Sequence, residues 1–180
     1  MSEHTISVLR IPQNQDFLAA VGKVAVCHAY LDHILRMMVK TVTSASLQEA
    51  LDATARQGSR ELRQRVRKLA RKRFAEGEVL VKLDALLERS RRATDKRNEF
   101  LHGLWTEDPA GNVMFVDNGH VPDSGPSIPK LEALADEIAG IAKGLNTARL
   151  KGFLHDALAI DRTSKNAAPA KSAEEEEGNG

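Results

Sequence analysis

The side chains best suited to chemistry lie in one short stretch, Asp95–Trp105, which reads DKRNEFLHGLW. Arg97 carries a permanent charge on a planar fork of N–H donors, which matches the oxygens of a phosphoryl group. His102 has an unperturbed pKa of about 6.5, so it can take up or release a proton at neutral pH. Asn98 can hydrogen-bond to either partner. These residue types suit proton transfer at a phosphodiester.

The spacing of these residues on a helix decides whether they can act together. A helical pattern covers about residues 78–102, and Asn98 and His102 share one flank of it because they are four positions apart. Arg97 lies at the centre of the apolar stripe, and five steps of about 100° place it roughly 140° from His102. The length of the Arg97 side chain, a turn at Gly103, or a second copy of the protein could bring the pair together. We therefore expect a composite site in the cleft of a homodimer.

An arginine on a packing face needs a partner, because an unpaired charge removed from water is costly. A structural ion pair is therefore the alternative to a functional role for Arg97, and Asp32 is the candidate partner. His28 and Asp32 stand four positions apart on an earlier helical pattern, so their side chains can meet. We expect either a satisfied buried pair, which is the commoner situation, or a pair that supports the Arg97 site from behind.

The residues from Ser59 to Phe74 form the most basic part of the chain, in which Glu61 is the single acid. The apolar positions of this helical pattern take one face, so the cations are expected to cover the rest of the circumference. Such a surface suits a polyanion, and an ordinary solvated helix face is the alternative. The candidate RNA-binding residues are Arg60, Arg63, Arg67, Lys68, Arg71 and Lys72.

Apolar residues recur at spacings of three and four along most of the chain, which predicts an all-α fold. Asp16 is the expected N-cap of the first helix. The predicted helices cover about residues 16–42, 44–58, 59–74, 78–102 and 129–158.

Turn-forming residues separate two short apolar runs, 104–106 and 113–116, and this pattern predicts a β-hairpin directly after the long helix. Trp105 is expected to pin the hairpin against the helix end, with base stacking as the alternative. The expected architecture is a helical bundle whose long motif-bearing helix leads into a small hairpin.

Length and composition indicate one domain with a substantial core. We expect a flexible lead-in over residues 1–15, a helical domain over 16–160 and a disordered acidic tail over 161–180. The tail contains the run Glu174–Glu177 and has too little apolar surface to fold. Its negative charge masks a positive excess in the folded body, although the formal net charge is only +1.

Cys27 is the only cysteine, so neither an intrachain disulfide nor a thiolate metal cluster can form. The N-terminus lacks the layout of a signal peptide, and we find no apolar run that approaches the roughly 20 residues needed to span a bilayer. We expect a cytoplasmic protein with no membrane contact, no bound metal and no cofactor.

The stretch from Arg97 to Trp105 resembles the signature of HEPN-domain proteins, in which an arginine is followed by a polar residue and then, after a short spacing, by a histidine. Here Asn98 is the polar residue, His102 follows at the four-residue spacing, and the His-Gly-x-Trp ending is similar to that of one stand-alone branch. Members of this family are helical and often dimeric. The resemblance implies a HEPN-like bundle over about residues 16–158.

The resemblance further implies a metal-independent endoribonuclease, with Arg97 and His102 as the catalytic pair and Asn98 orienting His102 or the phosphate. The RNA 2'-hydroxyl would attack the adjacent phosphate and leave a 2',3'-cyclic phosphate, while the basic helix holds the RNA backbone. Such an enzyme would act as a toxin or defence effector. An antitoxin or a nucleotidyltransferase would be its partner in trans.

Two other roles are open for the same residues. In one, the protein is a noncatalytic helical module that uses the dimer cleft to bind RNA, a nucleotide or a protein partner. In the other, Arg97 and His102 only hold the end of the helix together, so that replacing either lowers stability and leaves RNA binding unchanged.

Overall fold

The computed structural model describes residues 10–108, 110–116 and 127–167. In these ranges the chain forms, in order, α1 (Gln15–Thr43), α2 (Leu47–Asp52), α3 (Ser59–Arg73), α4 (Glu78–His102), β1 (Leu104–Glu107), β2 (Val113–Val116), α5 (Ile128–Lys151) and α6 (Phe153–Ala167). The prediction of an all-α fold with a small hairpin directly after the long helix is confirmed.

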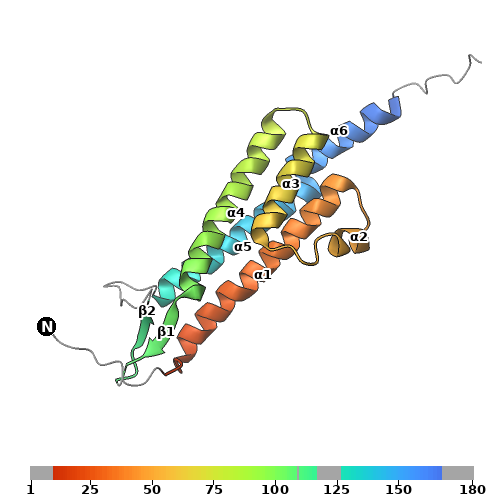
Figure 1. Ribbon diagram of the computed structural model, residues 1–180. Coiled ribbons are helices and arrows are strands. Elements are labelled where there is room, and N and C mark those ends of the chain that lie inside the picture. The colour runs from red at the N-terminus through yellow and green to blue at the C-terminus, as the bar shows by residue number, and fades with distance from the viewer. Residues whose placement is uncertain (1–9, 109, 117–126, 168–180) are drawn as a thin grey trace, which may run out of the picture.

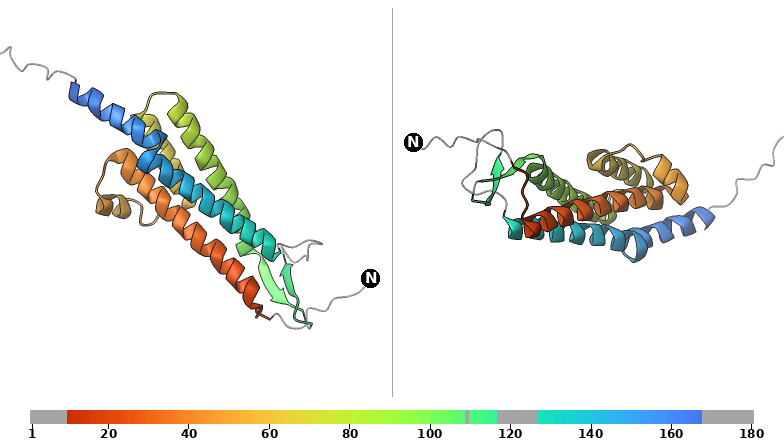
Figure 2. Two further views of the ribbon diagram at one scale, coloured as in Figure 1. Left: turned by 180° about the vertical axis from the view of Figure 1, so that it is seen from behind. Right: turned by 90° about the horizontal axis from the view of Figure 1, so that it is seen from below.

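The helices α1, α3, α4 and α5 form a bundle in which each packs against two neighbours (Figure 1). Around the bundle their order is α1, α5, α4 and α3, so α1 and α4 lie across a diagonal. Seen from behind, α1 and α5 lie side by side in front of α3 and α4 (Figure 2). Because α1 and α3 run in the same direction and α4 runs back, the first turn of α3 lies between the middle of α1 and the second half of α4.

The core consists of the apolar stripes predicted for the first and last long helices. Val24, Leu31 and Leu35 of α1 are fully shielded from solvent, as are Ile138 and Ile141 of α5. Each such side chain contributes about 1.5–3 kcal/mol relative to leaving it exposed. By length and hydropathy alone, α1 could also cross a membrane, which departs from the sequence expectation; here it is the helix that packs most extensively against α5 and α3.

The N-terminal boundaries differ from the predictions. Asn14 rather than Asp16 caps α1, because its side-chain oxygen accepts a hydrogen bond from the Phe17 amide at 2.9 Å. Residues 10–14 are held at the hairpin instead of forming a loose lead-in, since the Glu107 amide donates to the carbonyl of residue 10 at 3.2 Å. Residues 1–9 of the expected lead-in lie outside the described residues.

The second helix is shorter than expected. Its capping box, in which Ser46 and Glu49 satisfy each other's backbone amides, starts α2 at Leu47, whereas the predicted helix began at about residue 44. The helix ends at Asp52, and the chain then turns back along α1 until Gly58 caps α3. This return path brings the start of α3 to the middle of the bundle.

The C-terminal part of the bundle extends further than expected. After α5, helix α6 continues to Ala167, beyond the domain end predicted at residue 160. Arg73 Nε binds Asp161 Oδ2 at 3.1 Å, so an ion pair ties α6 to the end of α3. The acidic run Glu174–Glu177, on which the prediction of a disordered tail depended, lies outside the described residues.

The hairpin is fastened to the bundle by Trp105, as predicted. The Trp105 indole Nε1 donates to the Phe100 carbonyl at 2.8 Å, and its ring lies 4.5 Å from Phe17 and 4.8 Å from Phe115, measured between centroids. Trp105 and Phe115 also pair across the two antiparallel strands. A Cβ at Gly103 would overlap the Phe115 ring, so the chain leaves α4 through a position that only glycine fits.

Candidate functional site

A cleft of about 960 Å³ opens between α1, α3 and α4. Its lining is almost entirely polar or charged, and Leu87 is the one large apolar side chain in it. The polar lining residues are His28 and Asp32 of α1; Ser59, Arg60, Glu61, Arg63, Gln64 and Arg67 of α3; and Glu88, Arg91, Thr94, Asp95, Arg97 and Asn98 of α4.

Two of the three residues predicted to be catalytic lie in this cleft. Arg97 and Asn98 are both half-buried, and Arg97 Nη1 donates a hydrogen bond to Asn98 Oδ1 at 3.0 Å. Arg97 Nε is buried and has no hydrogen-bond partner among the residues that the structure describes. Among the described residues no carboxylate lies within 4.0 Å of this guanidinium, so the expected alternative, an ion pair with Asp32, is not formed. Asn98 therefore orients a guanidinium that has no ion-pair partner among the described residues.

His102, the third predicted catalytic residue, lies outside the cleft. It is the last residue of α4, it is exposed, and it makes no hydrogen bond or ion pair with any part of the chain that the structure describes. Gly103 has an extended conformation, with φ −70° and ψ 156°, and leads the chain into β1 without bringing His102 back toward Arg97. A single copy of the chain therefore does not assemble the predicted catalytic pair.

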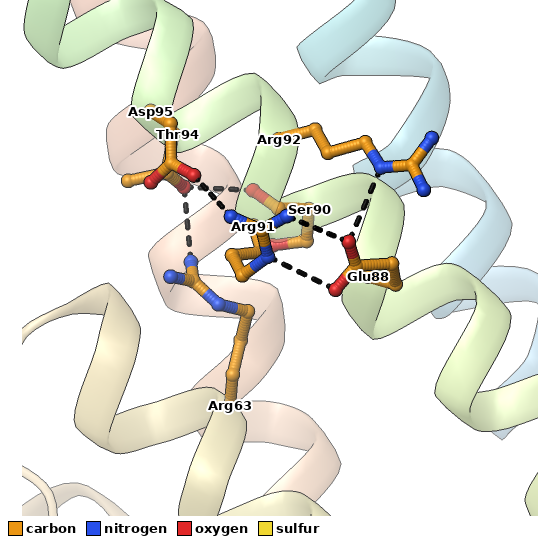
Figure 3. A network of polar contacts seen from close by, with 7 residues as sticks. All are labelled: Arg63, Glu88, Ser90, Arg91, Arg92, Thr94 and Asp95. Atoms are coloured by element: carbon orange, nitrogen blue, oxygen red, sulfur yellow. Dashed lines mark hydrogen bonds and ion pairs between the residues drawn. The ribbon is translucent and has the colours of Figure 1, made fainter.

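Arg63 is buried, although the sequence pattern placed it on the cationic surface of its helix. Only 6% of its surface is exposed, because it follows the fully buried Leu62 at the edge of the apolar face. Its Nη1 reaches across from α3 to donate to Thr94 Oγ1 at 2.9 Å (Figure 3). Burial lowers the pKa of the Arg63 guanidinium, and the more distant charges of Asp95 and Asp32 oppose this shift.

His28 is buried behind two hydroxyl groups, with its Nε2 3.4 Å from both Thr94 Oγ1 and Ser59 Oγ. The Thr94 hydroxyl donates a hydrogen bond to the Ser90 carbonyl at 2.8 Å, and the Ser59 hydroxyl donates one to Asp32 Oδ1 at 2.6 Å. Both hydroxyl oxygens can therefore only accept a hydrogen bond from His28, so its Nε2 carries a proton. In this arrangement the imidazole is not placed to activate Ser59 as a nucleophile.

The predicted proximity of His28 and Asp32 is confirmed, with Nδ1 and Oδ2 3.8 Å apart. Burial lowers the pKa of His28 below its ordinary value of 6.5; the Asp32 charge opposes this shift, and the charges of Arg97 and Arg63 add to it. His28 is therefore neutral at pH 7.

The acids on the α4 side of the cleft are already paired with other arginines (Figure 3). Arg91 binds Glu88 through Nη2 and Nε, at 2.8 and 3.0 Å, and binds Asp95 through Nη1. Arg92 Nε also binds Glu88, at 3.2 Å. Hydrogen bonds from these two arginines hold the pKa of Glu88 at about 2, so its carboxylate is ionised.

The remaining candidate RNA-binding cations divide into two groups, those with an ion-pair partner and those without one among the described residues. Arg67 Nε and Arg71 Nη2 both bind Asp84 of α4, at 2.6 and 3.2 Å, so one carboxylate offsets part of their charge. The exposed candidates without an ion-pair partner among the described residues are Arg60, Lys68 and Lys72.

Sequence reasoning missed the two hydroxyls of the site, Ser59 and Thr94, and the acids Glu88 and Asp95 that line the cleft. A single serine or threonine in a helical pattern carries no signal of its own, because its partner comes from another helix. The ion pairs of Arg91 with Glu88 and Asp95 had a readable signal, since three- and four-residue spacings place side chains on one helix face.

Neither a family model, nor a curated protein, nor a solved structure matches this chain. The fold and the site define an all-α bundle protein with an arginine-lined polar cleft.

Proposed function

We propose that this protein is a metal-independent endoribonuclease of the HEPN type, acting in the cytoplasm as a toxin or defence effector. The observation that supports this proposal best is the environment of Arg97, which Asn98 orients within the cleft and which no carboxylate neutralises among the described residues. An oriented guanidinium with uncompensated charge is suited to bind phosphoryl oxygens as negative charge develops on them.

In the proposed reaction, the RNA 2'-hydroxyl attacks the adjacent phosphorus, the bond to the 5'-oxygen breaks, and a 2',3'-cyclic phosphate remains. His102 exchanges the protons that this step requires, since both of its ring nitrogens are available to a substrate. Arg97 stabilises the phosphoryl charge. Arg60, Lys68 and Lys72 hold the RNA backbone through their exposed charges.

The separation of His102 from the cleft makes a homodimer part of the proposal. A second copy would bring its own His102 to the Arg97 of the first, and the same contact would be made in the other direction by two-fold symmetry. Leu104, which follows the helix end, is 46% exposed and offers apolar surface beside His102 for such a contact.

The same separation favours a second candidate function, a noncatalytic module that binds RNA. Arg97, Asn98 and the buried Arg63 all line the cleft. His102, the residue proposed to transfer protons, lies at the end of α4 and does not line it. In this alternative the cleft binds RNA phosphates, and the RNA stays intact.

An RNA cleavage assay in EDTA separates the two functions. Wild type, Arg97→Ala and His102→Ala are incubated with a mixed RNA, and His33→Ala, an exposed histidine on α1, is the matched control. We expect wild type and His33→Ala to cleave, and each site variant to lose about 100-fold or more in rate. Mass spectrometry should find 2',3'-cyclic phosphate ends. Intact RNA in every lane, with folded dimeric protein, would leave the binding module as the function.

A further inference from the structure

Arg63 is the buried charge that the proposed reaction does not use. Its side chain lies in the same cleft as Arg97, yet its only hydrogen bond with the described residues is the one from Nη1 to the Thr94 hydroxyl. A guanidinium has five N–H donors, so most of the hydrogen-bonding capacity of Arg63 is left for water or a ligand. Burying a charge with a single neutral partner is costly, which indicates that the position serves something other than stability.

The carboxylates near Arg63 are committed to other groups. Asp95 is bound by Arg91, and Asp32 accepts a hydrogen bond from the Ser59 hydroxyl. They act on Arg63 only as distant charges. The described protein therefore supplies no hydrogen-bonded counter-ion for Arg63.

Arg97 provides a second cation of the same kind in the same cleft. Its Nε is buried without a partner, and its Nη1 is held by Asn98. Both guanidiniums line the same cleft. The Thr94 hydroxyl contacts both Arg63 and His28, and Arg97 follows Thr94 by three positions on the same face of α4. Two planar forks that line one cleft suit the oxygens of a phosphate group, which can accept hydrogen bonds from both.

We propose that the cleft floor is a phosphate subsite, in which Arg63 and Arg97 together hold one backbone phosphate of an RNA strand beside His28. This inference rests on the RNA-directed function proposed above and names a binding role for Arg63. The cleft, at about 960 Å³, has room for a nucleotide, and the exposed Arg60 adds a further positive charge to its lining.

Binding is tested with an RNA that cannot be cut. A fluorescent 2'-O-methyl oligonucleotide is titrated with wild type, Arg63→Met and Arg65→Met at constant ionic strength, with anisotropy as the readout. Arg65 is the matched control, because it lies on the same helix and carries the same charge but donates to the Ala53 carbonyl outside the cleft. We expect Arg63→Met to weaken binding about tenfold or more, and Arg65→Met to weaken it much less.

Thermal unfolding separates binding from structure. Since Arg63 is buried with little compensation, we expect Arg63→Met to keep or raise the melting temperature while it loses affinity. Arg63→Lys, which keeps the charge and removes the fork, should also bind more weakly than wild type. Equal binding by wild type and folded Arg63→Met, or equal losses in the Arg63 and Arg65 variants, would overturn the proposal.

A direct readout uses inorganic phosphate as the probe and the His28 imidazole as the reporter. A phosphate between the two arginines would stabilise the protonated imidazole, so the NMR titration of His28 should shift to higher pH in phosphate than in chloride of equal ionic strength. Arg63→Met should abolish this shift. An unchanged His28 titration in wild type would contradict the subsite whether or not the variants fold.

The alternative ligand for this cleft is an acidic peptide, and oligoglutamate is the probe for it. If oligoglutamate displaces the oligonucleotide as well as unlabelled RNA does, the assignment to phosphate is overturned. Because the oligonucleotide lacks a free 2'-hydroxyl, binding is measured without cleavage. If the protein cleaves RNA but Arg63→Met binds the oligonucleotide as well as wild type does, only the phosphate subsite is rejected. If binding depends on Arg63 but RNA is not cleaved, only the nuclease function is rejected.

Discussion

Arg97 and His102 lie on the same helix and in different environments: Arg97 is half-buried in the cleft, and His102 is exposed outside it. Their five-residue spacing explains the difference, since it turns them roughly 140° apart on an ideal helix. The chain ends α4 at His102 and goes directly into β1, so no additional turn corrects the angle. The composite site proposed above therefore takes Arg97 from one copy of the chain and His102 from another.

Complementation between two inactive variants tests this composite site. In a two-fold dimer, mixing Arg97→Ala with His102→Ala leaves one of the two sites of each heterodimer with an intact arginine and an intact histidine. After random exchange of subunits, we expect about a quarter of the wild-type cleavage rate, because about half the dimers are heterodimers with one active site. If each site instead lay within one chain, the mixture would stay as inactive as either variant.

The buried imidazole predicts a loss of stability at mildly acidic pH. Since the pKa of His28 is lowered below 6.5 in the folded state, the unfolded chain binds more protons in the interval between the two values. The contribution of His28 to stability is thus complete above pH 6.5 and is lost as the pH falls through that interval. Urea unfolding of His28→Gln should show a weaker decline there than wild type, with His33→Gln as the control. Parallel curves for wild type and His28→Gln would contradict this assignment.

The salt dependence of RNA binding tests which cations of α3 contact phosphates. We expect Lys68→Gln and Lys72→Gln each to reduce the slope of log affinity against log salt by about 0.7, the value for one lost contact to a single strand. Arg71→Gln should change the slope less, because Asp84 already binds this guanidinium. If all three substitutions change the slope equally, the helix instead attracts RNA through its overall positive charge and not through individual phosphate contacts.

Gly103 should be intolerant of any side chain. A Cβ there would overlap the Phe115 ring, so we expect Gly103→Ala to lower the free energy of unfolding by about 1–3 kcal/mol. Gly22→Ala is the matched control: it lies within α1 with open space around its Cβ position, and we expect it to raise stability by about 0.5–1 kcal/mol. Denaturant unfolding measures both. Unchanged stability in Gly103→Ala would show that the hairpin moves freely away from α4.

Much of the fold could be predicted from local patterns. The periodicity of the apolar residues indicated the long helices, and the turn residues between two short apolar runs indicated the hairpin. The ends of elements were less predictable, because they depend on partners distant in sequence. The Arg73–Asp161 ion pair, which fastens α6 beyond the predicted domain end, joins two such distant residues.

The candidate site likewise has features that could be predicted from the sequence and features that could not. The Asp95–Trp105 stretch, the His28–Asp32 spacing and the basic helix were all visible in the sequence, because each is a pattern within one helix. That Arg63 turns inward to Thr94 while Arg71 binds Asp84 was not visible, because similar arginines on one helix are distinguished only by what the neighbouring helix presents.

The sequence by itself determined the class of fold and the kinds of chemical group, since periodicity and residue type act over a few positions. Only the tertiary structure decided that Arg97 and Arg63 line the same cleft between α1, α3 and α4, and that His102 lies outside it. The reason is physical: where a charged side chain comes to lie depends on burial and on hydrogen-bond partners, and packing supplies both from other parts of the chain.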